Sequence, residues 1–308
     1  MLNIKKNIPL ASHTTFKIGG PAKFFTEVKN ENEITEALNY AKKNNLKYFI
    51  LAGGSNILIS DKGFNGIVIK LQATSYKLQA TSIQCTAGLL LSQAVKLATD
   101  SSLTGLEWAA GIPGTVGGAV RGNAGAFGYS MASTVKEVRF IIQEKLQITN
   151  YKLQDCKFSY RNSIFKQNQN IIILSVKLRL KKGNTNEIKK KTKEILEKRK
   201  EKQPQFPSAG SFFKNPIISD KKIIEKFESD TKMKIKDDKI PAGWLIREAG
   251  LKGKKIGGAQ VSKKHGNFII NTGGATAKDV IMLASIIKQK VRMLFNVQLM
   301  EEARLIGF

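Results

Sequence analysis

The sequence is poor in the residues that build covalent or metal-based sites. It contains only two cysteines and two histidines among 308 residues. Cys85 and Cys156 have no metal-type spacing, and His13 and His265 lie far apart along the chain, so the sequence predicts no metal site. The cysteine usage is typical of reduced thiols in a cytosolic protein rather than of a disulfide framework.

Long apolar runs are also missing. No run approaches the ~20 apolar residues that a membrane-spanning helix requires. The first residues, MLNIKKNIPLASHTTF, lack the apolar segment of a secretory signal. We therefore expect a cytoplasmic protein with no membrane partner.

Acidic residues are scarce relative to basic ones. Lys and Arg number 51 and Asp and Glu 24, so the formal net charge is 51 − 24 = +27. Such a charge raises the alternative of a nucleic-acid-binding protein, which a steeply salt-dependent affinity would support. However, the lysines are scattered, and the one dense block, KKKTKEILEKRKEK at 189–202, is interrupted by glutamates as in a solvated helix. We predict no nucleic-acid partner, but a field that attracts small anions such as nucleotides.

Glycine is concentrated in one stretch, GLEWAAGIPGTVGGAVRGNAGAFG at 105–128. A second glycine turn, AGGSN at 52–56, follows the apolar strand KYFIL. Glycines let a ligand approach the backbone, and exposed N–H groups suit a diphosphate. The spacing is not G-x-G-x-x-G, so we predict no dinucleotide-binding Rossmann sheet. A single such turn is usually only a turn, but two of them favour an anion site.

The remaining pattern predicts an α+β protein. Asn30 and Glu33 resemble a helix-capping pair, and Thr276 is expected to cap a late helix. Prolines at 204 and 207 indicate a boundary. The sequence predicts strands at 47–51, 135–142, 171–180 and 298–306, and helices at 34–41, 89–98, 189–202 and 280–294. The hexapeptide KLQATS occurs at 70–75 and again at 77–82, which we interpret as a local duplication in a surface hairpin.

Several motifs together resemble one enzyme family. They are HTTFKIGGPA (13–22), AGGSNIL (52–58), GIPGTVGGA (111–119), NAGA (123–126), YRNSIFK (160–166), QPQFPSAGSFFKNP (203–216), AGWLIREAGLKG (242–253), GGAQVSKKHGNFIIN (257–271) and EARLIG (302–307). In this order they resemble the UDP-N-acetylenolpyruvoylglucosamine reductases over nearly the whole chain. Since only 50 positions separate Arg161 from Ser211, the resemblance is to the shorter, type II-like class.

The resemblance implies a fold and an activity. It implies a two-subdomain FAD-binding fold of the PCMH type (vanillyl-alcohol-oxidase-like), in the region of about 16–181, with subdomains at 1–66 and 67–202 and an α+β substrate domain at 203–308. It implies FAD as cofactor and NADPH as reductant, with a UDP-sugar as substrate in a cytoplasmic step of peptidoglycan synthesis. A monomer is expected. A related flavin oxidase and a decayed reductase are the alternatives within this fold.

The same resemblance assigns the FAD diphosphate to the two glycine loops. The expected cofactor-binding residues are Gly53, Gly54, Ser55, Asn56, Gly111, Ile112, Pro113, Gly114, Thr115, Gly117, Gly118, Asn123 and Gly125.

Three residues are expected to carry the chemistry. By resemblance, Arg161 holds and polarises the substrate carboxylate, which a guanidinium can do through a bidentate pair. Ser211 is the family's proton donor, although a serine that follows glycine is most often a cap. Glu302 completes the cluster, whereas the adjacent Glu301 fits a solvated strand edge better. Further substrate contacts are expected at Tyr160, Lys202, Lys214, Asn215, Gln260 and His265.

Overall fold

The computed structural model describes residues 2–308 and divides the chain into two compact units, each built from separate segments. The first unit comprises Met1–Ile8, Ala22–Gly53 and Asn65–Glu201, and the second Pro9–Pro21, Gly54–Phe64 and Lys202–Phe308. Each unit has its own buried apolar cluster. No helix within residues 2–308 is long and apolar enough to cross a membrane.

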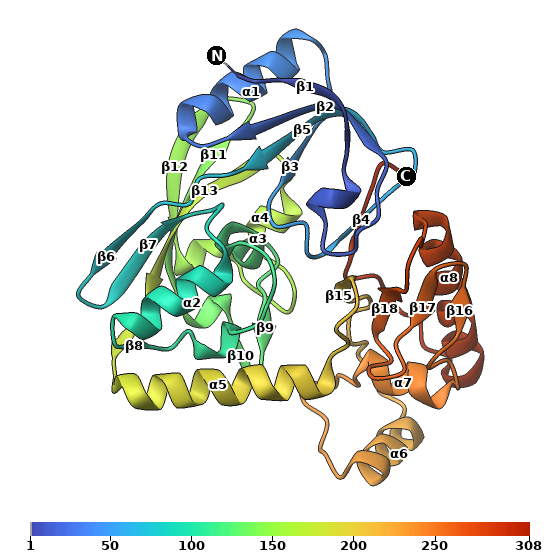
Figure 1. The fold of residues 1–308 in the computed structure, drawn as a ribbon. Helices are drawn as coiled ribbons and strands as arrows, with labels where there is room; N and C mark the ends of the chain where they lie inside the picture. The colour runs from blue at the N-terminus through green and yellow to red at the C-terminus, as the bar shows by residue number, and fades with distance from the viewer. Residues whose placement is uncertain (1) are drawn as a thin grey trace. The chain divides into compact units, whose positions relative to one another are not determined.

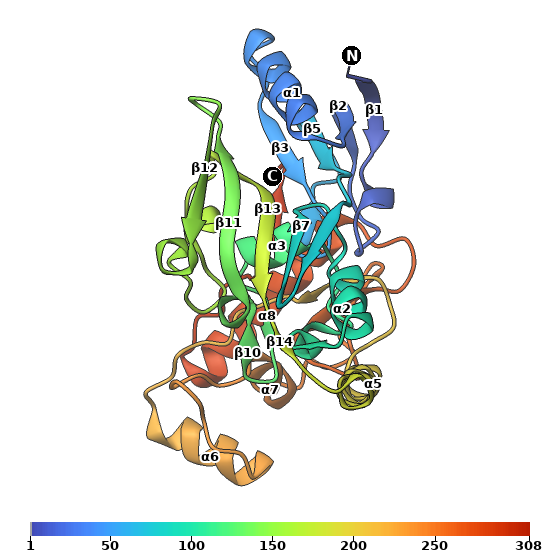
Figure 2. The same ribbon diagram turned by 90° about the vertical axis from the view of Figure 1, so that its left-hand side faces the viewer.

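The first unit contains two sheets and their covering helices (Figure 1). The four-stranded sheet has the order β1-β2-β5-β3, formed by β1 (Lys5–Pro9), β2 (Pro21–Val28), β5 (Phe64–Leu71) and β3 (Tyr48–Leu51). The five-stranded sheet has the order β12-β11-β13-β7-β6, formed by β12 (Gln147–Lys152), β11 (Val135–Ile142), β13 (Ile171–Arg179), β7 (Ser82–Thr86) and β6 (Tyr76–Gln79). Figure 2 shows β12, β11, β13 and β7 side by side.

Five α-helices, three 3₁₀ turns and two short strand pairs are the other elements in the described part of the first unit. The α-helices of the first unit are α1 (Glu31–Lys43), α2 (Leu91–Asp100), α3 (Val116–Arg121), α4 (Ile164–Gln167) and α5 (Thr185–Lys202), and its 3₁₀ turns are Glu107–Ala109, Met131–Ser133 and Leu153–Cys156. Two strand pairs complete it: β8 (Leu103–Thr104) with β14 (Lys181–Lys182), and β9 (Gly125–Ala126) with β10 (Tyr129–Ser130).

The second unit is a small α+β assembly. Its four-stranded sheet has the order β15-β18-β17-β16, formed by β15 (Ser208–Ser211), β18 (Phe268–Asn271), β17 (Ala259–Val261) and β16 (Lys255–Ile256). A separate pair joins β4 (Ile57–Ile59) in parallel to β19 (Arg304–Ile306). The helices are the 3₁₀ turn Ala11–His13, α6 (Lys221–Thr231), α7 (Ala242–Glu248) and α8 (Ala277–Phe295), of which α8 packs on β16 and β17.

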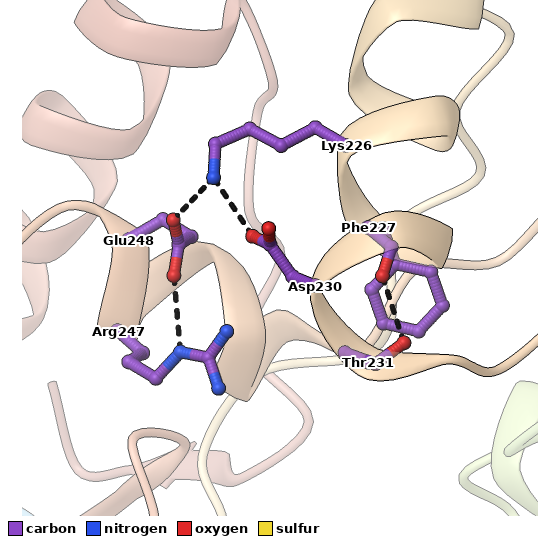
Figure 3. Close-up of polar contacts among 6 residues, drawn as sticks. All are labelled: Lys226, Phe227, Asp230, Thr231, Arg247 and Glu248. Carbon is purple, nitrogen blue, oxygen red and sulfur yellow. Dashed lines mark hydrogen bonds and ion pairs between the residues drawn. The ribbon is translucent and has the colours of Figure 1, made fainter.

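Helix α6 is attached to α7 by a small polar and aromatic contact (Figure 3). The Lys226 ammonium contacts Asp230 and Glu248 at 2.7 Å each, and lies 5.5 Å from the centre of the Trp244 ring. Phe227 packs edge-on against the same indole. This contact orients a helix that otherwise buries little apolar surface.

Many predicted elements are confirmed. Asn30 caps α1 by accepting a hydrogen bond from the Glu33 N–H, and Thr276 caps α8 in the same way with Asp279. The predicted strand at 135–142 has those bounds in β11. The expected strand at 298–306 was too long, because only Arg304–Ile306 pairs regularly, whereas Glu302 instead donates its N–H to the Phe212 carbonyl.

The two KLQATS copies have different surroundings. The first completes β5 and buries Leu71, while the second forms β6 and exposes Leu78. Only the second copy therefore lies in a surface hairpin as predicted, since the first belongs largely to an inner strand and the loop after it.

Candidate active site

The glycine stretch of the first unit packs its loop directly against the second glycine turn. A Cβ added to Gly53 would lie 2.6 Å from the Gly114 Cα, so a side chain at Gly53 would require a backbone shift. Gly111 and Gly114 have φ values of 75° and 115°, which L-residues rarely adopt. The two predicted anion loops thus meet at Gly53 and Gly114, and glycine is required for that approach.

This loop offers unused backbone donors. The N–H groups of Gly53, Gly114 and Thr115 donate no hydrogen bond within residues 2–308. Thr115 also starts α3, where its Oγ1 accepts from the Gly118 N–H at 3.3 Å. Unpaired N–H groups beside a helix start suit an anionic oxygen. Ile112, Pro113 and Gly117 of the predicted set lie on the same segment, and Gly117 packs against Ala87.

In the second unit, residues 54–56 are tied to the segment around Glu302. Gly54 has a φ of 61°, and a Cβ there would lie 2.2 Å from the His13 carbonyl oxygen. The Asn56 side-chain amide donates to the Glu302 backbone carbonyl at 3.2 Å, and the Asn56 backbone carbonyl accepts from the Arg304 N–H. Ser55, predicted with them, lies between these two residues.

Asn123 and Gly125 connect the glycine stretch to Arg161. The buried Asn123 amide donates to the Ser159 carbonyl at 2.9 Å and accepts from the Ala132 N–H at 3.1 Å. The Gly125 carbonyl accepts from Arg161 Nη1 at 3.1 Å. Both residues, predicted as cofactor contacts, therefore also position the predicted carboxylate-binding arginine.

Arg161 occupies a tight turn in the first unit. Ser159 and Asn162 exchange both backbone hydrogen bonds, and Arg161 between them has a φ of 55°. A non-glycine residue in this region is held there at a cost, as is common at functional sites. The Arg161 guanidinium lies 5.8 Å from the centre of the Tyr160 ring, so two predicted site residues are adjacent in space as well as in sequence.

Ser211 ends β15 in the second unit and caps no helix. Its hydroxyl forms no hydrogen bond within residues 2–308, although the side chain is partly buried. Gly210 before it has a φ of 76°, and the pairing with β18 is irregular between Ser208 and Ser211. The common capping role of a serine after glycine is thus absent, and the hydroxyl remains available to a ligand.

Glu302 lies beside Ser211 through its backbone. The Glu302 N–H donates to the carbonyl of Phe212, the residue after Ser211, at 2.8 Å. The neighbouring Glu301 instead forms an ion pair with Lys288 at 2.9 Å. The structure therefore brings Ser211 and Glu302 together and gives Glu301 a structural partner, while Arg161 belongs to the first unit.

The other predicted substrate contacts have varied surroundings. The Asn215 side-chain oxygen, Oδ1, accepts from the Ala242 N–H at the start of α7, and the Gln260 side-chain amide donates to the Gly253 carbonyl across a hairpin. His265 accepts from the Asn267 N–H through Nδ1, and burial lowers the pKa of His265 below its ordinary value. Lys202 is exposed at the end of α5, and Lys214 is partly buried with its N–H bonded to Met300.

Asn267 has a structural role that the sequence motifs did not reveal. Its side chain is buried and bonds both the N–H and the carbonyl of Phe213, at 2.9 and 2.8 Å. Its own carbonyl accepts from the Phe212 N–H at 2.8 Å. Three hydrogen bonds thus fix the two residues after Ser211. The only sequence signal was that Asn267 lies in the motif KHGNF beside His265.

Within residues 2–308 no group of three or more His, Cys, Asp or Glu side chains could hold a metal ion. Burial raises the pKa of Cys85 to about 12, so this thiol is an inert part of the core.

Two family models match the chain. One describes an FAD binding domain and matches residues 22–144, and the other describes the C-terminal domain of UDP-N-acetylenolpyruvoylglucosamine reductase and matches residues 202–306. The fold and the glycine loops accordingly define an FAD-dependent oxidoreductase, with an α+β FAD-binding region followed by a C-terminal α+β domain.

Relatives specify the family. The chain is 42% identical over 303 residues to a UDP-N-acetylenolpyruvoylglucosamine reductase of Caldanaerobacter subterraneus subsp. tengcongensis, which covers 98% of this chain and 93% of that protein. It is 40% identical to the corresponding protein of Alkaliphilus oremlandii, with 97% and 92% covered. The crystal structure of the Thermus caldophilus reductase matches with a TM-score of 0.80 and 32% identity over 100% of both chains. The chain belongs to the UDP-N-acetylenolpyruvoylglucosamine reductase family, whose members are flavoproteins of peptidoglycan synthesis.

Proposed function

We propose that this protein uses NADPH and bound FAD to reduce UDP-N-acetyl-3-O-(1-carboxyvinyl)-glucosamine to UDP-N-acetylmuramate, as a monomer in the cytoplasm. The observation that carries this proposal is the Ser211 hydroxyl, which has no hydrogen-bond partner within residues 2–308 and precedes Phe212, whose carbonyl accepts from the Glu302 N–H. The names of the relatives supply the substrate.

The cofactor fits the residues that would hold it. Unpaired N–H groups at Gly53, Gly114 and Thr115, together with the absence of side chains at the glycines, suit a diphosphate. When bound, FAD supplies the transfer of a hydride between the nicotinamide and the double bond of the substrate. Everything else in the reaction is assigned to side chains of this chain.

Arg161 is assigned to the substrate carboxylate. A guanidinium forms paired, charge-assisted hydrogen bonds with a carboxylate, and these withdraw charge from the adjacent double bond. The same bonds strengthen as negative charge develops on the carboxylate side of the double bond, which lowers the barrier. The turn at Ser159–Asn162 supports this role because it fixes the base of the side chain.

Ser211 is assigned to the proton. Its hydroxyl donates a proton to the carbon that bears the carboxylate, which requires a strongly basic carbanion because serine is a weak acid. Fixing Phe212 and Phe213 through Asn267 supports this role, since proton donation depends on a constant distance. Glu302 is assigned to a hydrogen bond with the substrate acid.

One sequence of measurements tests the function. Purified protein is scanned for flavin absorbance, and NADPH oxidation is then followed with and without the enolpyruvyl nucleotide. We expect bound flavin and a rate that depends on the nucleotide. Colourless protein that takes up no FAD contradicts the proposal, and oxygen-coupled turnover that ignores the nucleotide indicates a flavin oxidase instead.

A further inference from the structure

Arg199 is a partly buried cation that has no ion-pair partner within residues 2–308. It lies in the last turn of α5, and its Nε is buried without a hydrogen-bond partner. Its Nη2 donates to the Trp108 carbonyl at 3.3 Å, and its guanidinium carbon lies 5.2 Å from the centre of the Phe127 ring. Within residues 2–308 Arg199 forms no ion pair with a carboxylate.

A second guanidinium lies close to it. Burial, and to a smaller extent the charge of Arg161, lowers the pKa of Arg199 below its ordinary value. Both residues belong to the first unit, and each donates to a backbone carbonyl of the glycine stretch. Arg161 donates to the Gly125 carbonyl, and Arg199 donates to the Trp108 carbonyl. Two arginines thus converge from α5 and from the turn at Ser159–Asn162.

The position of Arg199 also depends on a glycine. A Cβ on Gly111 would lie 2.9 Å from Arg199 Cδ, so the loop leaves room for this side chain. Burying a cation without an anion, next to another cation, is unfavourable, and an apolar side chain would pack there at lower cost. Such an arrangement is expected where a ligand brings the negative charge.

We propose that Arg199 is a second anion-binding residue beside Arg161, and that it contacts the carboxylate of the substrate. The inference rests on the proposed function, because that function supplies an anionic substrate at Arg161. The free Nε gives Arg199 an unused donor of the geometry that carboxylates accept. Phe127 holds the guanidinium plane through a cation–π contact, which limits its motion before the ligand arrives.

Two matched ligands distinguish contact of Arg199 with the substrate carboxylate from contact with the diphosphate or the cofactor. UDP-N-acetylmuramate carries the carboxylate, whereas UDP-N-acetylglucosamine has the same diphosphate and sugar without it. Their affinities for the FAD-loaded enzyme are measured from the change in flavin absorbance. The proteins compared are the wild type, Arg199→Met, Arg199→Lys and the control Arg292→Met, whose side chain is exposed on α8.

For Arg199→Met we expect the affinity for UDP-N-acetylmuramate to fall about 10- to 100-fold, which is the range for a lost charged hydrogen bond. The affinity for UDP-N-acetylglucosamine, the FAD content and the rate of flavin reduction by NADPH should remain at the wild-type level. Arg199→Lys should recover part of the loss because it keeps the charge, and Arg292→Met should resemble the wild type.

Each other outcome overturns the inference. Equal weakening of both nucleotides places Arg199 on the diphosphate, loss of FAD places it on the cofactor, and slower reduction by NADPH alone places it on the nicotinamide nucleotide. A fall in melting temperature with unchanged affinities makes Arg199 a packing residue only. If the wild type binds neither nucleotide and turns nothing over, the proposed function fails and this inference fails with it, whereas wild-type binding with an unaffected Arg199→Met removes Arg199 alone.

Discussion

The glycine loop of the first unit and the Ser211–Glu302 region of the second use opposite means to prepare a site. At Gly53 and Gly114 the loop works by lacking side chains, so that two backbones approach and leave their N–H groups unpaired. At Ser211 a side chain is the functional group, and hydrogen bonds from Asn267 fix the backbone next to it. The glycine loop therefore depends on the absence of side chains, and the Ser211–Glu302 region depends on hydrogen bonds that fix its backbone.

This difference determines which substitutions each region tolerates. In the glycine loop, an added methyl group is harmful wherever it meets backbone or a ligand, and polarity matters little. Around Ser211, shape can be preserved while a hydrogen bond is removed, so isosteric changes are the sharper probe. Three substitutions test this contrast and a fourth serves as a reference, from the largest expected effect to the smallest.

Ser211→Ala should abolish most of the turnover while leaving the fold intact. The hydroxyl has no partner within residues 2–308 to lose, and loss of a general acid lowers a rate by about 10²- to 10⁴-fold. Flavin reduction by NADPH, followed by stopped flow, should be unchanged. Ser285→Ala, at an exposed position of α8, is the control, and wild-type turnover by Ser211→Ala removes Ser211 from the mechanism.

Asn267→Leu should destabilise the second unit and slow turnover together. The Phe213 N–H and carbonyl would each lose a buried partner, at about 1–3 kcal/mol per group. Urea denaturation measures the loss of stability, and kcat measures the effect on Ser211. FAD content should be retained, because Asn267 bonds Phe212 and Phe213 and none of the expected FAD contacts. A destabilised variant with unchanged kcat would show that Asn267 does not position Ser211.

Gly118→Ala separates a ligand loop from a simple turn. Gly118 is helical, and an added Cβ would lie no closer than 3.6 Å to any neighbour, so alanine should stabilise α3 by about 0.5–1 kcal/mol. If bound FAD occupies the space beside Gly118, the affinity for FAD should nevertheless fall about tenfold, a loss of about 1.4 kcal/mol.

Melting temperature and FAD titration measure these two effects of Gly118→Ala independently. Gly122→Ala, which also has room for a methyl group at the end of α3, is the control and should leave FAD binding unchanged. A Gly118→Ala variant with a higher melting temperature and wild-type FAD affinity contradicts the predicted contact.

Lys226→Met should have the smallest effect and serves as a reference outside both regions. Contact with Lys226 lowers the pKa of Asp230 and of Glu248 below their ordinary values (Figure 3). A carboxyl group whose pKa is lowered in the folded protein stabilises the fold at pH values above its ordinary pKa. This stabilisation is lost as the pH falls from the ordinary pKa through the lowered one. The difference in melting temperature between wild type and variant should therefore be small at neutral pH, vanish in acid and shrink with salt. A difference that persists at low pH indicates loss of packing on Trp244 instead.

Local signals in the sequence predicted local structure well. The Asn30–Glu33 pair and Thr276 specify helix starts through contacts three residues apart, which any window of sequence contains. The strand at 135–142 was equally clear from its composition. Helix α6 was not predicted, because it buries only Phe227 fully and its stability depends on contacts with α7.

Contacts between residues far apart in the chain could not be predicted from the sequence pattern. The identical hexapeptides at 70–75 and 77–82 differ in burial because β5 has neighbours on both sides whereas β6 is a sheet edge. The family motif favoured Glu302 over Glu301, but no sequence pattern indicated that Lys288, thirteen residues away on α8, pairs with Glu301. The contacts of Asn267 and Arg199 could not be predicted for the same reason, since their partners lie far along the chain.

The parallel pair of β4 and β19 has a consequence for synthesis of the chain. Residues 57–59 are synthesised long before their partner strand, residues 304–306. Such a distant pairing forms slowly, and until it does β4 presents an unpaired edge to other chains. The second unit is therefore expected to complete its fold only after Arg304–Ile306 has been synthesised, and a nascent chain that stalls before Arg304 would leave the edge of β4 unpaired and open to aggregation.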